Sequence, residues 1–248
     1  MRYLIVSDMH GNWDAFDCVL QAADPEDFDS VLVLGDLVGY GAAPNQVVEA
    51  VRNLNGHLHV IRGNHDKVVA GVDDGSNFNF AALTAARWTT QSLSDDNLTY
   101  VRDLPLGPVE IEPGIHICHG SPLDEDAYVF SDFDAREVFQ GSKAVLTFFG
   151  HTHIPCVFSL TEDGQIEVGL LRGKKGRLEL QEGRRYLINP GSIGQPRDRD
   201  PRAAYITFDS ETMEVTWYRL PYPIEKAQER IIEAGLPRVL AERLAVGQ

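Results

Sequence analysis

The stretch MRYLIVSDMHG, residues 1–11, decides the fold that we predict for this chain of 248 residues. Its apolar run Tyr3–Val6 has the length and composition of a buried strand. The run leads into Asp8 and His10, and an extended backbone directs two side chains at this spacing the same way. The chain thus begins with a strand that delivers potential metal ligands to its carboxyl end.

Two further apolar runs in the first half have the same form, and amphipathic stretches separate them. The predicted strands are Val31–Leu34 and Leu58–Ile61, and the predicted helices lie near residues 12–23 and 44–54. Strands that alternate with helices favour parallel pairing in an α/β fold. Residues 76–103 carry polar caps and helical spacing, so we predict a helical insertion there, where substrate selection could be built.

The second half is richer in strands, and turn residues with hairpin spacing separate several of them. The predicted strands are residues 115–118, 144–149, 156–160, 166–171, 185–188, 203–208 and 214–220. They indicate a second sheet that packs on the first. A helical segment is predicted for residues 224–246, with a break near Gly235-Leu236-Pro237. No linker or repeat interrupts the pattern, so we predict a single domain over residues 1–248.

The composition argues against several classes of protein. Lys and Arg number 22 against 37 Asp and Glu, and the net charge of −15 disfavours binding of bulk nucleic acid. No apolar run reaches the roughly 18 residues that a membrane span needs. Three cysteines without CxxC spacing suggest neither a disulfide framework nor a thiolate zinc site, and they favour a cytoplasmic protein. A small substrate is therefore expected.

Five predicted strand ends carry side chains that bind metals. The predicted ligands are Asp8, His10, Asp36, Asn64, His119, His151 and His153. Because open α/β sheets bind ligands at the carboxyl ends of their strands, these side chains can converge. Nitrogen and oxygen ligands without thiolates suit manganese, iron or zinc. Seven ligands divided between two ions, with the Asp36 carboxylate shared, leave positions for water and phosphoryl oxygens, as a catalytic site requires.

The motifs DMH, GDLVG, GNHD, HG and GHTH, in this order, resemble those of the calcineurin-like metallophosphoesterase superfamily. The later stretch Asn189-Pro-Gly-Ser192 is similar to a segment of its small bacterial and archaeal members. The resemblance implies a four-layer α/β/β/α sandwich of two mixed sheets flanked by helices. It also implies two groups of metal ligands, one formed by Asp8, His10, Asp36 and His153 and the other by Asp36, Asn64, His119 and His151.

The resemblance further implies hydrolysis of a small phosphodiester or phosphomonoester through attack by a hydroxide that bridges two metals. His65 is the candidate proton donor to the leaving group, and Asp66 is the residue that would orient it. Arg62 and Arg197 are candidates for binding the substrate phosphate. A salt bridge to one of the many acidic residues explains either arginine equally well.

Two other functions stay open at this point. Dinucleoside polyphosphate hydrolases and Ser/Thr protein phosphatases share the GD and GNH motifs. Residues 35–44 resemble the glycine-containing loop of that branch but lack its usual Asp-Arg-Gly. The superfamily also contains a non-catalytic scaffold of vesicle-coat complexes that has lost its catalytic His, whereas this chain retains His65. These patterns do not specify the oligomeric state.

Overall fold

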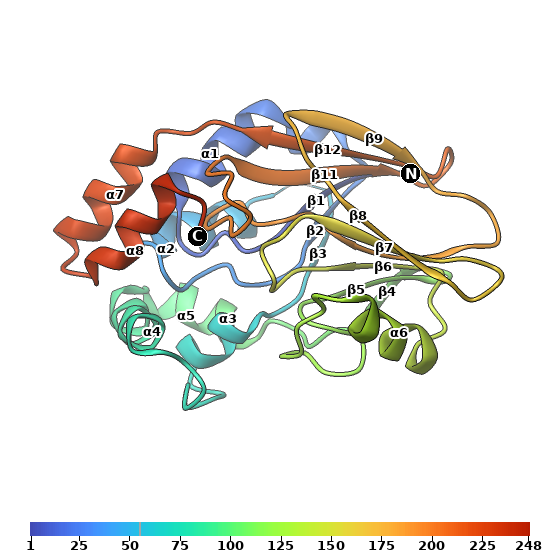
Figure 1. The fold of residues 1–248 in the computed structure, drawn as a ribbon. Coiled ribbons are helices and arrows are strands. Elements are labelled where there is room, and N and C mark those ends of the chain that lie inside the picture. Colours follow the sequence, from blue (N-terminus) through green and yellow to red (C-terminus); the bar gives the residue numbers. More distant parts are fainter. Residues whose placement is uncertain (55) are drawn as a thin grey trace.

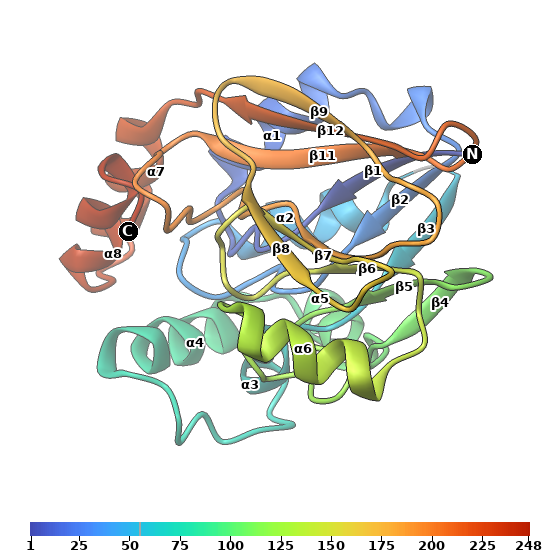
Figure 2. The ribbon, with the colours of Figure 1, turned by 45° about the vertical axis from the view of Figure 1, so that its right-hand side comes forward.

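The computed structural model of the chain describes residues 1–54 and 56–248. Two mixed six-stranded sheets pack face to face, and helices cover their outer faces (Figures 1 and 2). This arrangement confirms the predicted α/β/β/α sandwich. No helix in the described residues is long and apolar enough to cross a membrane.

The first sheet has the strand order β3-β2-β1-β11-β12-β9. Its strands are β1 (Arg2–Val6), β2 (Ser30–Val33), β3 (His57–Val60), β9 (Lys175–Glu179), β11 (Ala203–Asp209) and β12 (Glu214–Leu220). β1, β2 and β3 are parallel, as predicted, and β11 pairs antiparallel with β1. The carboxyl ends of three strands therefore lie at one edge of this sheet.

The second sheet has the strand order β4-β5-β6-β10-β7-β8. Its strands are β4 (Val109–Glu112), β5 (Ile115–Cys118), β6 (Leu146–Phe149), β7 (Cys156–Leu160), β8 (Ile166–Leu170) and β10 (Arg185–Asn189). β5, β6 and β10 are parallel. Their carboxyl ends also share one edge.

The helices divide between the two outer faces. The α-helices are α1 (Trp13–Ala22), α2 (Pro44–Arg52), α3 (Asn64–Val69), α4 (Phe80–Ser92), α5 (Asp95–Arg102), α6 (Asp132–Gly141), α7 (Ile224–Glu233) and α8 (Arg238–Glu242). Short 3-10 turns are η1 (Pro25–Asp27) and η2 (Arg243–Ala245). α6 covers the second sheet, whereas α7 and α8, coloured red in Figure 1, lie at the end of the sandwich opposite the N-terminus.

The apolar run that opens the chain is buried on both sides. Tyr3 and Ile5 contribute to the core between the two sheets, whereas Leu4 and Val6 pack against the helices. Alternate side chains of β1 thus enter different cores, which is why the run has no polar positions. The same burial on both faces made β1 recognisable from the sequence.

The structure differs from the predicted elements in two respects. Four elements were not predicted: β4, β9, α3 and α6. The two strands are short sheet edges with partly exposed, polar sequences. β9, β11 and β12 also belong to the first sheet and not to the second. α4 and α5 lie within residues 76–103, where helices were predicted, and Gly235 lies between α7 and α8.

Candidate metal centre

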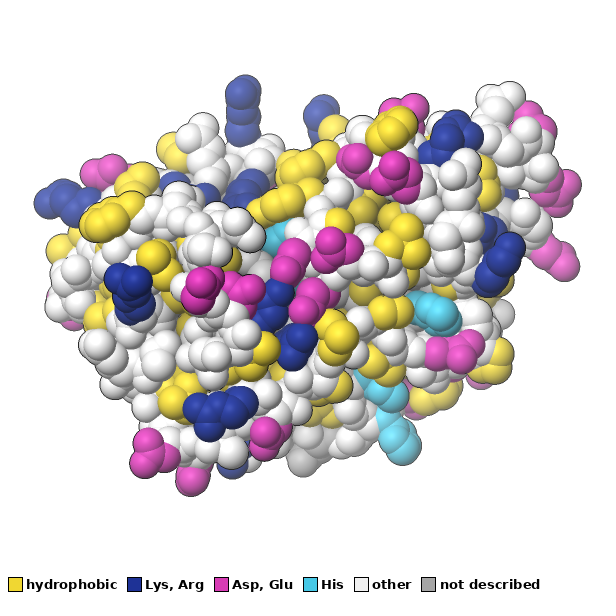
Figure 3. Space-filling model, turned by 90° about the horizontal axis from the view of Figure 1, so that it is seen from below, with side chains coloured by type: hydrophobic (Ala, Val, Ile, Leu, Met, Phe, Trp, Pro, Cys, Tyr) yellow, Lys and Arg dark blue, Asp and Glu magenta, His cyan; other side chains and the backbone are white. Residues whose placement is uncertain are grey.

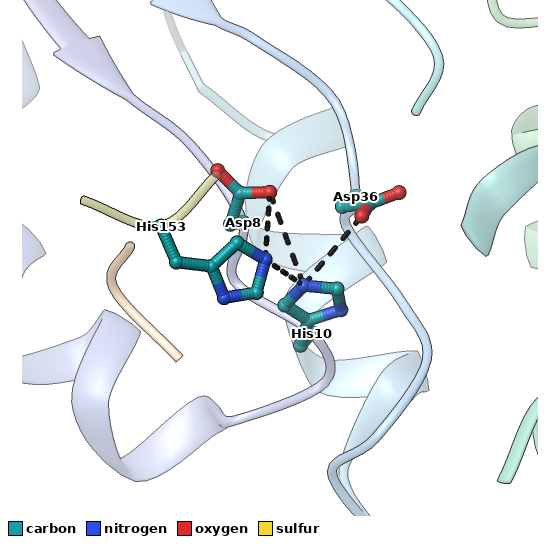
Figure 4. Close-up of side chains that lie close together, drawn as sticks. All are labelled: Asp8, His10, Asp36 and His153. Carbon is teal, nitrogen blue, oxygen red and sulfur yellow. Dashed lines mark hydrogen bonds and ion pairs between the residues drawn. The ribbon is translucent and has the colours of Figure 1, made fainter. Parts of the chain in front are cut away.

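The structure brings the predicted ligands together in two groups at the edge where the parallel strands end. One group has four members and the other three, and within each group all ligand atoms lie within 4.8 Å of one another. The first group is Asp8, His10, Asp36 and His153 (Figure 4). The second group is Asp36, His119 and His151. Each side chain is buried, and the two groups share one carboxylate.

Asp36 is that shared residue. Its Oδ2 atom lies 3.5 Å from Nε2 of His10 and 3.4 Å from Nε2 of His119. Asp36 is 1% exposed, and Oδ2 has no hydrogen-bond partner among the described residues. A buried carboxylate oxygen without a partner is costly, whereas two adjacent cations would satisfy it. The donor set of this structure therefore fits a pair of metal ions.

Main-chain carbonyl groups orient the histidine rings of the first group. Nδ1 of His10 donates to the carbonyl of Val38 (3.2 Å), and Nδ1 of His153 donates to the carbonyl of Gln195 (2.6 Å). With the protons on Nδ1, both Nε2 atoms present lone pairs, and they face each other 3.0 Å apart. Lone pairs at this distance repel unless a proton or a metal ion lies beside them. The rings are thus held in the tautomer that metal ligands need.

Main-chain carbonyl groups also orient the histidine rings of the second group. Nδ1 of His119 donates to the carbonyl of Leu34 (2.8 Å), and Nε2 of His151 donates to the carbonyl of Asp126 (3.1 Å). The remaining nitrogens of the two rings lie 3.2 Å apart. Oδ1 of Asn64 lies 3.1 Å from Nε2 of His119, so the predicted amide ligand also reaches this group.

Burial and the Asp36 carboxylate set the charges of the second group. Burial disfavours the charged form of His119, but Asp36 outweighs it and raises the pKa of His119 to about 10. Burial, followed by the charge of His119, lowers the pKa of His151 to about 3. Without metal the group thus holds one proton beside Asp36. A divalent cation that binds there would replace this proton.

The backbone at the ligands is strained. Five of the seven predicted ligands have left-handed φ angles: Asp8 (54°), His10 (49°), Asp36 (52°), His151 (66°) and His153 (59°). Each such conformation costs a non-glycine residue roughly 1–3 kcal/mol and persists where the surroundings fix it, often at functional sites. Gly63 permits one close approach, because a Cβ atom there would overlap the carboxylate of Asp36.

The segment Asn189–Ser192, which the sequence singled out, supports two of the ligand loops. Nδ2 of Asn189 donates to the carbonyl of Gly150 (2.6 Å), and Oγ of Ser192 donates to the carbonyl of Asp8 (2.8 Å). Both donor side chains are fully buried. The segment therefore fixes the main chain from which ligands of both sheets project.

His65 and Asp66 lie at the start of α3 but do not bond to each other. The His65 ring lines the pocket, and its Nδ1 has no hydrogen-bond partner among the described residues. Burial lowers the pKa of His65 to about 4, so the ring is neutral at pH 7 and carries one N–H. Asp66 accepts the main-chain N–H groups of Gly63 (3.0 Å) and Val38 (3.2 Å). Asp66 thus fixes the backbone around His65 and not the ring.

A pocket of about 370 Å³ opens at the two groups. Its walls include Tyr40, Phe78 and Tyr128, none of which the sequence motifs identified. The Tyr128 ring stacks on His151 with 3.9 Å between ring centroids, and the Phe78 centroid lies 4.4 Å from that of His65. Figure 3 shows the face that carries α3 and α6, where a recessed histidine lies between hydrophobic and charged side chains.

The two candidate phosphate-binding arginines have different surroundings. Arg62 forms a bidentate ion pair with Glu125, at 2.9 and 3.0 Å, and does not line the pocket. Arg197 lines the pocket, and its Nη2 donates to the hydroxyl of Tyr40 (3.2 Å). The structure therefore places Arg197, and not Arg62, beside the two groups of predicted metal ligands.

Comparison with known proteins agrees with this geometry. The family profile described as calcineurin-like phosphoesterase superfamily domain matches residues 1–213. This chain therefore belongs to the calcineurin-like phosphoesterase superfamily. Residues 214–248, which form β12 and the C-terminal helices, lie outside the matched range.

Individual proteins show the same relationship. The chain is 38% identical over 248 residues to an uncharacterized protein of Methanocaldococcus jannaschii, covering 98% of this chain and 97% of that protein. It is similar to the crystal structure of a metallophosphoesterase from Sphaerobacter thermophilus, with a TM-score of 0.85, 37% identity, and coverage of 100% and 99%. A symmetrical bis(5'-nucleosyl)-tetraphosphatase of Psychromonas ingrahamii is 27% identical over 107 residues, which is 43% of this chain and 39% of that protein.

Proposed function

We propose that this chain hydrolyses a small phosphodiester or phosphomonoester with two divalent cations bound at the metal centre. The observation that carries the proposal is the buried Oδ2 atom of Asp36, which accepts no hydrogen bond among the described residues and lies between His10 and His119. Membership of the phosphoesterase superfamily supports the reaction class.

Each proposed cation has its own set of ligands. The first set is Asp8, His10, Asp36 and His153, and the second is Asp36, Asn64, His119 and His151. Nitrogen and oxygen donors of this kind suit manganese, iron or zinc. When bound, the cations would supply Lewis-acid polarisation of the phosphoryl group and activation of water at neutral pH.

The side chains of the pocket have separate tasks in this proposal. His65 lines the pocket, and when protonated its ring would donate a proton to the leaving oxygen and return to the neutral form that burial favours. The guanidinium of Arg197 binds a phosphoryl oxygen and fixes the orientation of the substrate. Asp66 joins the turn before His65 to the segment after β2 through its two hydrogen bonds from the main chain of Gly63 and Val38.

A second candidate function is hydrolysis of dinucleoside polyphosphates. The 27% identity with a symmetrical bis(5'-nucleosyl)-tetraphosphatase favours it, although that match spans 43% of this chain. A protein with this function would cleave diadenosine tetraphosphate faster than either a simple diester or a simple monoester.

Parallel assays with added manganese test the proposal. The substrates are bis-p-nitrophenyl phosphate, p-nitrophenyl phosphate and diadenosine tetraphosphate, and the metal content of the protein is measured in the same samples. Hydrolysis of the first or second substrate, abolished by a chelator and restored by manganese, is the expected result. Preference for the third would favour the second candidate. If none of the three substrates is hydrolysed while both metals are bound, the result would identify a non-catalytic scaffold.

A further inference from the structure

The ring of Tyr40 separates the metal centre from two arginines. On one side it contacts the rings of His10 and His65, with centroids 4.7 and 4.4 Å away. The guanidinium carbons of Arg197 and Arg243 lie 5.8 and 5.3 Å from the same centroid. Two positive charges thus gather around one aromatic ring at the wall of the pocket.

Neither arginine has an acidic side chain as a partner among the described residues. Nη2 of Arg197 donates to Tyr40 and to Oε1 of Gln195 (3.3 Å), whereas its buried Nε has no acceptor. Nε of Arg243 donates to the main-chain oxygen of Gln248 (2.6 Å). In a chain with a net charge of −15, two adjacent arginines without an Asp or Glu partner among the described residues are an exception.

The proximity of the two cations has an electrostatic cost. Burial lowers the pKa of Arg243, and the neighbouring charge of Arg197 lowers it further. A bound anion would remove this repulsion and satisfy the free N–H of Arg197.

The C-terminal segment brings Arg243 to this position. Arg243 begins η2, which follows α8 and lies outside the residues 1–213 that the family profile matches. The carbonyl of Gly247 accepts the main-chain N–H of Arg199 (2.9 Å), and a Cβ at Gly247 would meet the nitrogen of Asp200 at 2.7 Å. The segment is therefore fastened to the loop that carries Arg197.

We propose that Arg197 and Arg243, packed around Tyr40, form an anion subsite beside the metal centre that favours substrates with negative charge beyond that of a single diester. Arg197 contacts the phosphate oxygens, and Arg243 is a positioning residue that adds positive potential. Dianionic phosphomonoesters and polyphosphate chains share this chemistry. The inference rests on the proposed function and names the substrate class of the same site.

Binding of methylenediphosphonate, which is not hydrolysed, tests the subsite on the full-length, manganese-loaded protein by calorimetric titration. We expect Arg243→Gln to weaken binding about tenfold and Arg197→Gln to weaken it at least as much, because each removes a charge from the anion's surroundings. The matched control is Arg238→Gln, since Arg238 is an exposed C-terminal arginine paired with Glu242. Unchanged binding in Arg243→Gln would overturn the proposal.

Steady-state kinetics separate a charge effect from a general structural one. Arg243→Gln should raise KM about tenfold for p-nitrophenyl phosphate and diadenosine tetraphosphate, and leave KM for bis-p-nitrophenyl phosphate within about twofold. A larger effect on p-nitrophenyl phosphate indicates a monoester site, and a larger effect on the tetraphosphate indicates a polyphosphate site. Arg243→Lys, which keeps the charge, should restore most of the affinity.

Equal losses on all three substrates, or an Arg243→Lys variant as weak as Arg243→Gln, would contradict the subsite. Wild-type protein that binds methylenediphosphonate but hydrolyses no substrate would leave the subsite standing and refute the proposed function. Hydrolysis that does not depend on Arg243 would support the proposed function and refute the subsite. Thermal unfolding of each variant without ligand shows whether it is folded.

Discussion

Several side chains of the candidate metal centre form a main-chain hydrogen bond with one polar atom and direct a second polar atom into the cluster. Carbonyl groups accept one N–H from His10, His119 and His153, and each ring turns its other nitrogen toward the cluster. Oδ1 of Asp36 accepts the main-chain N–H of His65 (2.8 Å), while Oδ2 has no partner among the described residues. Substitution of single residues should therefore separate metal binding from turnover.

Asp36→Asn should lose at least one of the two metal ions and at least about a hundredfold in turnover, since a neutral amide bridges cations poorly. Metal analysis after gel filtration measures the first effect, and hydrolysis of the preferred substrate measures the second. Asp17→Asn is the control, because Asp17 lies on α1 and bonds to Gln21. A crystal structure of Asp36→Asn with both ions in place would refute the bridging role.

His65→Ala should lower turnover by about 10²–10⁴-fold and leave both metals bound. The reason is that His65 lines the pocket and its Nδ1 has no partner in the described residues, so the protonated ring can donate to a leaving oxygen there. The loss should be largest for an alkyl ester and smallest for a p-nitrophenyl ester, whose leaving group needs little help from a proton. Unchanged hydrolysis of the alkyl ester would exclude His65 as the donor.

Among the elements, an ion-pair network fastens α3 to the loop between β5 and α6. Glu125 in that loop accepts from Arg62 and, at 3.4 Å, from Nζ of Lys67. Lys67 also pairs with Asp126, whose main-chain carbonyl orients the ring of His151. Through Asp126, the network helps to orient the predicted ligand His151. Arg62 is part of this network and therefore points away from the pocket.

Glu125→Gln should lower the free energy of unfolding by about 1–2 kcal/mol at pH 7. Burial opposes ionisation of Glu125, but the hydrogen bond from Arg62 outweighs it, and the pKa is lowered. A lowered carboxyl pKa contributes stability at neutral pH that is lost as the pH falls through the folded-state pKa. Urea denaturation should therefore show the difference from wild type shrinking below about pH 5.

The matched control for this substitution is Glu137→Gln, which removes an exposed carboxylate of α6. It should leave the unfolding free energy nearly unchanged at every pH. A constant difference between wild type and Glu125→Gln from pH 7 to pH 3 would show that the ionised carboxylate is not the source of the stability.

The strands that are easiest to recognise in the sequence are those with apolar runs, such as β1 and β2. Residues 3–6 of β1 are all apolar because its two sides enter different cores. The edge strands β4 and β9 have one exposed side and sequences with Glu, Lys and Arg, so their pattern does not differ from that of a loop. Joining of β11 and β12 to the first sheet depends on long-range pairing that no local pattern contains.

The sequence could predict those residues of the candidate site that directly follow strands. Asp8, Asp36 and His119 follow apolar runs, and residues of these types at several strand ends together predict metal binding. Tyr128 and Arg243 reach the pocket region from a loop and from the C-terminal segment, and only the folded chain brings them there. The candidate ligands can thus be found from short sequence motifs, whereas the residues that surround them in the pocket are known only from the tertiary structure.

At the scale of the whole molecule, the candidate metal centre is formed by residues from both sheets. Asp8 and Asp36 follow strands of the first sheet, while His119 and His151 follow strands of the second. Oδ1 of Asp8 accepts the main-chain N–H of His151 at 3.3 Å, so the two halves are already in contact without a cation. Cations shared between the two sets of ligands would add a link that the unfolded chain lacks.

Removal of the metals should therefore destabilise the entire sandwich and not only the loops. A ligand at a hundred times its Kd stabilises the folded state by about 2.7 kcal/mol, which corresponds to a shift in Tm of about 5–10 °C for a chain of this size. Differential scanning calorimetry with manganese and after chelation measures the shift. Asp36→Asn should show a much smaller one, because it lacks the shared carboxylate. Equal Tm values for wild-type protein with and without manganese, in samples whose metal content is verified, would mean that the cations do not join the sheets.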